Sequence, residues 1–265
     1  MKIGFIGCGN MATAIVKGIV SSSIALGSDI NVFDINVSAY ENLVSAYGCN
    51  KMNSAKETAK RSDILFLAVK PNVIASVLEE IDFEAANNNC LLISIAAGKT
   101  IDFIESKLNN EHRIVRVMPN INAMVGEAIS GYCTNKNVSK DDCAIVEKLL
   151  NSFGKCLKLD ETYFPVFGVI GGCSPAFAYM FIDALARAGV KNGMKKDDAL
   201  KIAAQAVYGS AKMILETDEH PYKLIDNVCS PGGTTIEGVT SLQADNFESA
   251  VHNAVNKAIE KDKKL

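Results

Sequence analysis

The chain has 265 residues, of which 48% are hydrophobic and 22% charged, so it is long enough for a sizeable core and two domains of ordinary size. Its formal net charge of -3 argues against a nucleic-acid or anionic-membrane partner. It also lacks the Pro-rich, Ser-rich and single-sign charged tracts that are typical of disordered chains.

The cysteine and histidine pattern excludes two further classes. None of the eight cysteines forms a C-x-x-C pair and the three histidines lie far apart, so we expect no metal site and no disulfide framework. A buried strand is expected within the first six residues, which leaves no room for an export signal. The most apolar stretch, 176–190, is interrupted by Asp183 and Arg187. We therefore expect a soluble cytoplasmic protein.

Apolar, β-branched runs alternate with amphipathic stretches over residues 1–160. This alternation is typical of βαβ units and predicts an α/β domain with a mostly parallel sheet. The expected strands are 2–6, 30–33, 64–68, 91–95, 113–117 and 128–133. The expected helices are 11–21, 39–47, 54–60, 73–81, 101–108 and 143–153, the last with Gly154 as its C-cap.

A glycine-rich segment, residues 4–12, follows the first expected strand and precedes the first expected helix. It contains G-x-G-x-x-A, and this context predicts a Rossmann-type dinucleotide-binding domain, with the pyrophosphate at the helix N-terminus. A glycine-rich turn without a ligand is the alternative. The residues expected to bind the cofactor here are Gly7, Cys8, Gly9, Asn10, Met11 and Ala12.

An acidic residue, Asp34, ends the second expected strand at the place where a carboxylate accepts hydrogen bonds from the adenine ribose. Because it would repel a 2'-phosphate and no Arg or Lys stands beside it, we expect NADH to be used at least as well as NADPH. A solvated acid in a turn is the alternative.

Two later loops follow strands that end at the same edge of the predicted sheet, and both are expected to line the cofactor groove. Small residues in the second loop would let the nicotinamide approach the backbone, and Lys70 could meet phosphate or a substrate carboxylate. Ordinary turns between strand and helix are the alternative for both. The residues concerned are Ala68, Val69, Lys70 and Pro71, then Ala96, Ala97 and Gly98.

The pattern becomes helical and alanine-rich after about Glu161, where we place the boundary between domains 1–160 and 161–265. Ser174 and Pro175 suit the start of a long helix that ends before Gly193. Residues 176–190 are apolar on nearly all sides, so this helix packs either against another subunit or inside one large monomer. Further helices are expected at 196–216, 222–228, 235–244 and 247–261.

The densest loop chemistry in this half lies at residues 227–236, which read as a helix end, a glycine turn and a new helix start. Ser230, Thr234 and Thr235 bring hydroxyls and free backbone N–H groups into one small volume, which suits a carboxylate. Helix capping alone is the alternative explanation of one hydroxyl.

Residues 221–243, which include Cys-Ser-Pro-Gly-Gly-Thr-Thr at 229–235, closely resemble the signature of the pyrroline-5-carboxylate reductase family. The resemblance also covers residues 4–12, 66–71, 94–98, 116–120, 175–177 and 183–190, and so spans essentially the whole chain.

The resemblance implies hydride transfer from NADH or NADPH to the C=N bond of 1-pyrroline-5-carboxylate, giving L-proline in the last step of proline synthesis. It implies an all-α dimerisation domain after the Rossmann-type domain, an active site that draws on two chains, and in some members rings of dimers. It assigns the ring nitrogen to Thr235 and a cofactor contact to Asn227. It implies substrate contacts by Glu161, Ser230, Gly232, Gly233 and Thr234.

Three positions depart from the family pattern. Cys173 replaces a serine before Pro175, Asn122 stands where a proline is usual, and Ala55 replaces an asparagine that contacts the cofactor. The adenine-side contacts are therefore in doubt, and Asn53 should not be assumed to replace that asparagine.

Two other functions compete with this interpretation. A dehydrogenase of the β-hydroxyacid or prephenate type would be expected to carry a catalytic Lys or His on the first long helix of its helical domain, and residues 177–187 supply neither. A regulatory module that senses a dinucleotide without turnover is disfavoured by the intact segment 230–235. Oxidation of NADH with and without the pyrroline substrate discriminates among the three.

Overall fold

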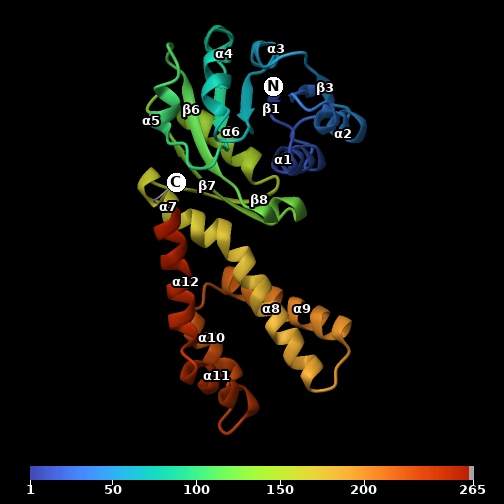
Figure 1. Cartoon of the computed structure of the whole chain (residues 1–265), viewed down its shortest axis with the longest axis vertical. Helices are drawn as coiled ribbons and strands as arrows, with labels where there is room; N and C mark the ends of the chain where they lie inside the picture. The colour runs from blue at the N-terminus through green and yellow to red at the C-terminus, as the bar shows by residue number, and fades with distance from the viewer. Residues whose placement is uncertain (263–265) are drawn as a thin grey trace. The chain divides into compact units, whose positions relative to one another are not determined.

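A computed structural model describes residues 1–262. The chain forms two compact units, Met1–Gly172 and a second that begins at Cys173 (Figure 1). The first unit is α/β and the second is entirely helical. The predicted fold class, a Rossmann-type domain followed by an all-α region, is confirmed.

One eight-stranded sheet organises the first unit, in the order β3-β2-β1-β4-β5-β6-β7-β8. All neighbouring strands are parallel except β6 and β7, so the prediction of a mostly parallel sheet is confirmed. The strands are β1 (Ile3–Ile6), β2 (Ile30–Phe33), β3 (Asn50–Lys51), β4 (Ile64–Leu67), β5 (Leu91–Ser94), β6 (Arg113–Met118), β7 (Ala128–Thr134) and β8 (Gly154–Lys158).

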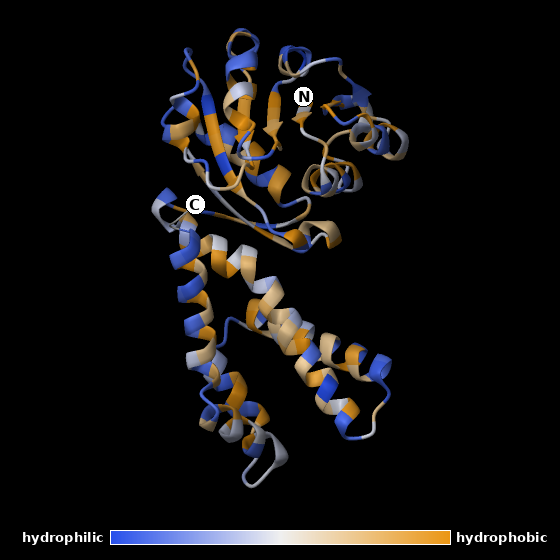
Figure 2. Cartoon of the chain, viewed as in Figure 1, coloured by the Kyte–Doolittle hydropathy of each residue, from blue (hydrophilic) through white to orange (hydrophobic). Residues whose placement is uncertain are grey.

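Helices cover both faces of this sheet, so the central strands are buried on both sides and read as continuous apolar runs (Figure 2). On one face Phe5 of β1 and Phe66 of β4 stack with their ring centres 4.7 Å apart. The other face packs Leu65 and Leu67 against the helix that follows β4. The helices are α1 (Asn10–Ser21), α2 (Val37–Tyr47), α3 (Ala55–Lys60), α4 (Ile74–Asn87), α5 (Ile101–Glu105) and α6 (Lys140–Leu150), with short 3-10 turns η1 (Gly27–Asp29) and η2 (Ile121–Val125).

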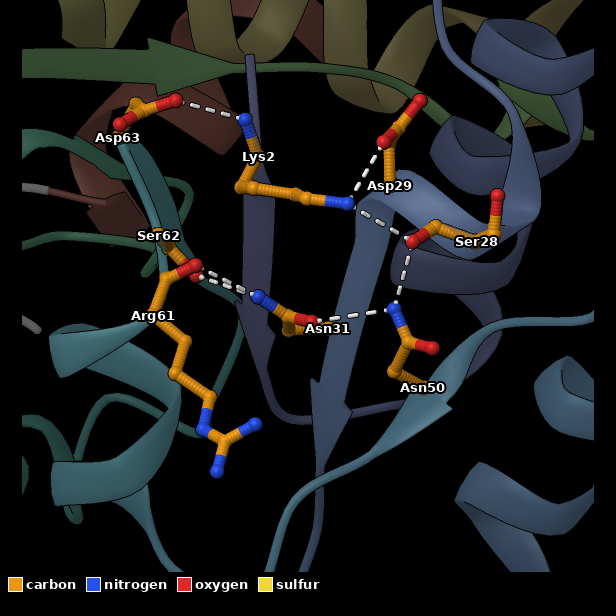
Figure 3. Close-up of polar contacts among 8 residues, drawn as sticks. All are labelled: Lys2, Ser28, Asp29, Asn31, Asn50, Arg61, Ser62 and Asp63. Carbon is orange, nitrogen blue, oxygen red and sulfur yellow. Dashed lines mark hydrogen bonds and ion pairs between the residues drawn. The ribbon is translucent and has the colours of Figure 1, made fainter.

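A polar network joins the amino-terminal ends of β1, β2 and β4 (Figure 3). The Lys2 Nζ atom lies 2.7 Å from the Asp29 Oδ1 atom, and the Lys2 backbone N–H donates to Asp63 at 2.7 Å. The buried Asn31 side chain donates to the Arg61 carbonyl at 2.8 Å. The polar groups at the amino ends are thus satisfied within the fold, whereas ligands of open α/β sheets bind at the carboxyl ends.

Gly154 was expected to cap a helix, and this prediction is wrong. The helix α6 begins earlier than expected, where Ser139 and Asp142 form a capping box, and it ends at Leu150. Gly154 instead starts β8, and a Cβ atom there would lie 2.1 Å from the Ala128 carbonyl oxygen of the neighbouring strand.

The start of the long helix also differs from the expectation. Helical backbone runs through η3 (Glu161–Tyr163), α7 (Phe164–Phe167) and the π-helical η4 (Gly168–Cys173) into α8 (Ser174–Lys191), so Ser174 does not cap a new helix. Phe164 is fully buried with the first unit's core, and Asn120 donates to the Gly171 carbonyl at 2.9 Å. These contacts hold residues 161–172 against the first compact unit, which extends to Gly172.

The second unit has almost no core of its own. Its buried cluster consists of three alanines, Ala186, Ala199 and Ala203, where α8 meets the next helix, and the side chain of Met180 is 73% exposed. The apolar long helix is therefore not buried within one chain. Of the two alternatives given above, burial inside one monomer is contradicted, and packing against another subunit remains. The remaining helices are α9 (Lys196–Thr217), α10 (Pro221–Val228), α11 (Thr234–Ala244) and α12 (Phe247–Asp262).

One helical stretch among residues 1–262, Glu161–Lys191, is long and apolar enough by length and composition to cross a membrane. This test alone is weak evidence, since apolar helices of soluble proteins also meet it. Within the stretch, Arg187 and Asp183 form an ion pair at 2.5 Å.

Candidate active site

A groove of about 730 Å³ opens at the carboxyl ends of β1, β2, β4, β5 and β6 in the first unit. This is the edge where open α/β sheets bind their ligands, and the volume lies in the usual range for small-molecule sites. Twelve predicted cofactor residues line the groove together: Gly7, Gly9, Asn10, Met11, Ala12, Asp34, Ala68, Val69, Lys70, Pro71, Ala96 and Ala97.

The glycine loop between β1 and α1 forms the centre of the groove. Gly7 has a φ of +94°, and a Cβ atom there would lie 2.5 Å from the Ala68 carbonyl oxygen, so only glycine fits this turn. Gly9 is the N-cap of α1, with open space around it and no side chain that caps the helix. The first N–H groups of α1 are therefore available to phosphate oxygens.

Cys8 lies between these glycines but does not line the groove. Its side chain is buried in the core beneath the loop, and this burial, with a smaller effect of the Asp34 carboxylate, raises the pKa of the thiol to about 12. Only the backbone of Cys8 faces the cofactor side, through its N–H group.

Asp34 is held rigidly at the end of β2. Its Oδ2 atom accepts from the Cys8 N–H at 2.7 Å and its Oδ1 atom accepts from the Asn36 N–H at 2.8 Å. Each oxygen keeps a further lone pair for a ribose hydroxyl. Ile35, which follows, is 91% exposed on the groove, and Glu80 of α4 adds a second carboxylate to the lining.

The departures at positions 53 and 55 are also visible in this half of the groove. Ala55 lines it as the first residue of α3, which Ser54 caps. The Asn53 side chain donates to the Glu57 Oε2 atom at 2.8 Å, so it is committed to its own helix. Asn53 therefore does not take the place of the missing asparagine.

The other half of the groove contains two cations, Lys70 and Arg116. Lys70 is exposed in the loop after β4, whereas the Arg116 side chain on β6 is only 8% exposed. The Arg116 Nη1 atom lies 2.8 Å from the Glu161 Oε1 atom, and its guanidinium carbon lies 4.3 Å from the ring centre of Phe164. Gly98, with a φ of +72°, follows Ala97 but is outside the lining.

Glu161 lies on the side of this ion pair away from the groove. Its Oε1 atom also accepts from the Ile101 N–H at 2.9 Å, and the residue lines a neighbouring pocket with Cys133 and Asp160. Burial raises the pKa of the Cys133 thiol to about 12, so this thiol is neutral. Glu161 is thus placed to hold Arg116 rather than to reach into the groove.

Several groove residues were not predicted from the sequence. Part of the signal was present, since Met118 and Pro119 lie within residues 116–120, which carry part of the family resemblance. Helix α4 contributes residues at i, i+3, i+4 and i+7, the spacing of one helix face. The groove residues missed are Phe33, Ile35, Val73, Ser76, Val77, Glu80, Arg116, Val117, Met118 and Pro119.

The second unit carries the predicted substrate loop between α10 and α11. Gly232 has a φ of +68°, and the Gly233 N–H donates to the Ser230 carbonyl at 3.0 Å, which closes a tight turn. Gly233 is the N-cap of α11, and no side chain caps this helix, so N–H groups beside Thr234 and Thr235 are available to an anion. Asn227 lies on the last turn of α10.

No group of three or more His, Cys, Asp or Glu residues suited to a metal ion occurs within residues 1–262. The polar side chains that line the groove are Asn10, Asp34, Lys70, Ser76, Glu80 and Arg116.

Comparison with protein families finds two matches. Residues 161–265 match a model described as pyrroline-5-carboxylate reductase dimerisation, and residues 2–98 match one described as NADP oxidoreductase coenzyme F420-dependent. The pyrroline-5-carboxylate reductase of Escherichia coli is 44% identical, over 100% of this chain and 98% of its own length. The Arabidopsis thaliana enzyme of that name is 36% identical, over 100% and 95%.

Among solved structures, the chain is again similar to pyrroline-5-carboxylate reductases. A pyrroline-5-carboxylate reductase from Coxiella burnetii superposes with a TM-score of 0.94 at 30% identity, over 99% of this chain and 97% of that one. The Plasmodium falciparum pyrroline carboxylate reductase, which has NADP bound, gives 0.87 at 36%, over 100% and 97%. A prephenate dehydrogenase from Aquifex aeolicus shares only the fold, with a TM-score of 0.54 at 16% identity, over 100% and 97%.

Proposed function

Because this chain belongs to the pyrroline-5-carboxylate reductase family, we propose that it reduces the C=N bond of 1-pyrroline-5-carboxylate to give L-proline. The observation that carries the proposal is the groove at the carboxyl edge of the sheet, with a G-x-G-x-x-A loop at its centre. A nicotinamide dinucleotide bound there supplies the hydride. A protonated cyclic imine needs little else but positioning, which agrees with a site built from hydroxyls and backbone N–H groups.

NADH is proposed to serve at least as well as NADPH. Asp34 supports this, because its carboxylate is fixed by the N–H groups of Cys8 and Asn36 at the end of β2. Glu80 is a second carboxylate in the groove lining. A 2'-phosphate there would meet repulsion, whereas ribose hydroxyls can donate to Asp34. The relative from Plasmodium falciparum has NADP bound, so the proposed preference rests on Asp34 of this chain alone.

The loop before α11 is proposed to bind the substrate. Ser230, Gly232, Gly233 and Thr234 would hold its carboxylate, because the N-terminus of this 11-residue helix offers unpaired N–H groups and a positive dipole end. The Thr235 hydroxyl would bond the ring nitrogen. Asn227, two residues before Cys229, is proposed to contact the cofactor.

Glu161 is proposed to act on the site indirectly. Its Oε1 atom is already bonded to Arg116 and to the Ile101 N–H, and it lies outside the groove lining. Its contribution would be to orient Arg116 rather than to touch the substrate.

The second unit is proposed to form a homodimer, since it matches a dimerisation model and leaves apolar side chains such as Met180 and Leu185 exposed in one chain. This accounts for the apolar stretch Glu161–Lys191 without a membrane. The site would then draw on two chains, rings of dimers would be a further step of assembly, and the protein would be soluble in the cytoplasm.

Steady-state oxidation of NADH with the pyrroline substrate tests the assignment of Thr235. We expect Thr235→Ala to lower kcat by about 100-fold with little change in the Kd of NADH, because the hydroxyl is proposed to meet the imine. Thr240→Ala on the same helix is the matched control, since the Thr240 hydroxyl bonds only the Ile236 and Glu237 carbonyls. An unchanged kcat in Thr235→Ala would reject the role, and NADH binding without any turnover would favour the sensing module.

A further inference from the structure

Arg116 is a buried charged residue of the groove to which the proposed reaction gives no part. An arginine keeps its charge at any physiological pH, and a buried charge is costly unless it is paired. Here the pairing is one-sided. The Nη1 atom donates to Glu161 and the guanidinium lies over Phe164, and Glu161 is the one described residue that accepts a hydrogen bond from this guanidinium.

The ion pair between Arg116 and Glu161 is therefore oriented relative to the groove. Arg116 lines the groove, whereas Glu161 lines the neighbouring pocket with Ile101 and Cys133. The Ile101 N–H holds the Glu161 carboxylate, and the Phe164 ring packs against the Arg116 guanidinium. The two charged groups therefore cannot swap places. The positive charge of Arg116 therefore faces the groove, and the negative charge of Glu161 lies on the other side of the ion pair.

Strand order places this positive charge in one half of the groove. Asp34 at the end of β2 marks the adenosine side, and the glycine loop after β1 marks the pyrophosphate. The strands β4, β5 and β6 continue on the opposite side of β1 from β2. Arg116 pairs in register with Ser94 at the end of β5, just before Ala96 and Ala97. It therefore lies in the half that remains for the nicotinamide.

We propose that Arg116 makes the groove selective for the redox form of the cofactor, favouring the neutral dihydronicotinamide over the positively charged oxidised ring, with Glu161 limiting the strength of this preference. The inference rests on the proposed function, because it requires a nicotinamide dinucleotide in the groove. A nearby cation repels the oxidised ring and leaves the reduced ring unaffected. The reductase would thereby bind its hydride donor in preference to the spent cofactor.

The test is the ratio of the Kd of NAD+ to the Kd of NADH in the full-length protein, without pyrroline substrate. NADH binding is followed by its fluorescence and NAD+ binding by competition. We expect Arg116→Met to lower this ratio by roughly tenfold, the effect of one charge about 8 Å away at an effective dielectric of about 30. Glu161→Gln should raise it by about fivefold, because this charge lies on the far side of the ion pair, about 12 Å away. Arg116→Lys, which keeps the charge, should stay within about threefold of the unchanged protein.

The opposite signs separate this role from a structural one, since mere damage to the ion pair would move both variants in the same direction. Arg113→Gln is the matched control, because Arg113 lies on the same strand, pairs with Asp142 and is outside the groove. If Arg116→Met does not fold, Glu161→Gln alone decides. Equal ratios in all variants, or shifts of one sign, would overturn the inference, while failure of the unchanged protein to bind either cofactor would overturn the proposed function itself.

Discussion

Replacing the Asp34 carboxylate by an amide should shift cofactor use toward NADPH. The carboxylate is fixed by two backbone N–H groups, at 2.7 Å from Cys8 and 2.8 Å from Asn36, so it cannot swing away from a 2'-phosphate. A phosphate with about two charges at about 7 Å, in a partly solvated groove of effective dielectric about 40, is repelled by about 2 kcal/mol. We therefore expect Asp34→Asn to raise the NADPH to NADH ratio of kcat/KM by roughly 30-fold, mainly through KM.

The assay is steady-state kinetics with both cofactors at low and high salt. Asp29→Asn is the matched control, because Asp29 pairs with Lys2 at the other end of β2, away from the groove. Its cofactor ratio should not change. A strong preference of the unchanged protein for NADPH, or a shift of less than threefold in Asp34→Asn, would refute the electrostatic argument.

Three further predictions follow from burial. A fragment ending at Asp160 should be less stable than one ending at Gly172 by at least about 3 kcal/mol in urea unfolding, because it lacks the buried Phe164 side chain; equal stabilities would contradict the unit boundary. Met180→Asp should turn the proposed dimer into a monomer by light scattering, because it places a charge on an exposed apolar surface; an intact dimer would mean that this part of α8 is not in the interface. The pKa of Cys8 is raised to about 12, so its reactive thiolate appears only as pH approaches that value, and iodoacetamide at pH 8 should label it in urea but not in the native protein. Labelling of native Cys8 would show that the loop opens.

The central fold could be predicted because its signals are local. The strands β1, β2, β4 and β5 are short apolar runs with helices on both sides, and few other structures satisfy that pattern. The strand β3 was missed because Asn50 and Lys51 form only two residues of a polar edge. The strand β8 was missed because Lys155 and Lys158 flank only two apolar residues and because its first residue, Gly154, resembled a helix cap.

The site was predictable only where backbone shape decides it. Gly7 and Gly9 could be assigned from the sequence. The turn has no room for a side chain at Gly7, and Gly9 is a helix N-cap without a side chain. The position of Arg116 could not, since an arginine inside an apolar strand gives no sign of its partner Glu161, which comes much later in the chain. The same holds for the N–H group of Cys8, whose bond to Asp34 depends on tertiary structure.

The most direct test of the central claim is isotope transfer. The purified protein is incubated with 1-pyrroline-5-carboxylate and NADH that carries deuterium at the transferable C4 position, and the product is analysed by chiral chromatography and mass spectrometry. We predict L-proline with one deuterium at ring carbon 5, formed in proportion to the NADH oxidised. Oxidation of NADH without deuterated proline, or the absence of any oxidation that depends on the pyrroline, would contradict the account.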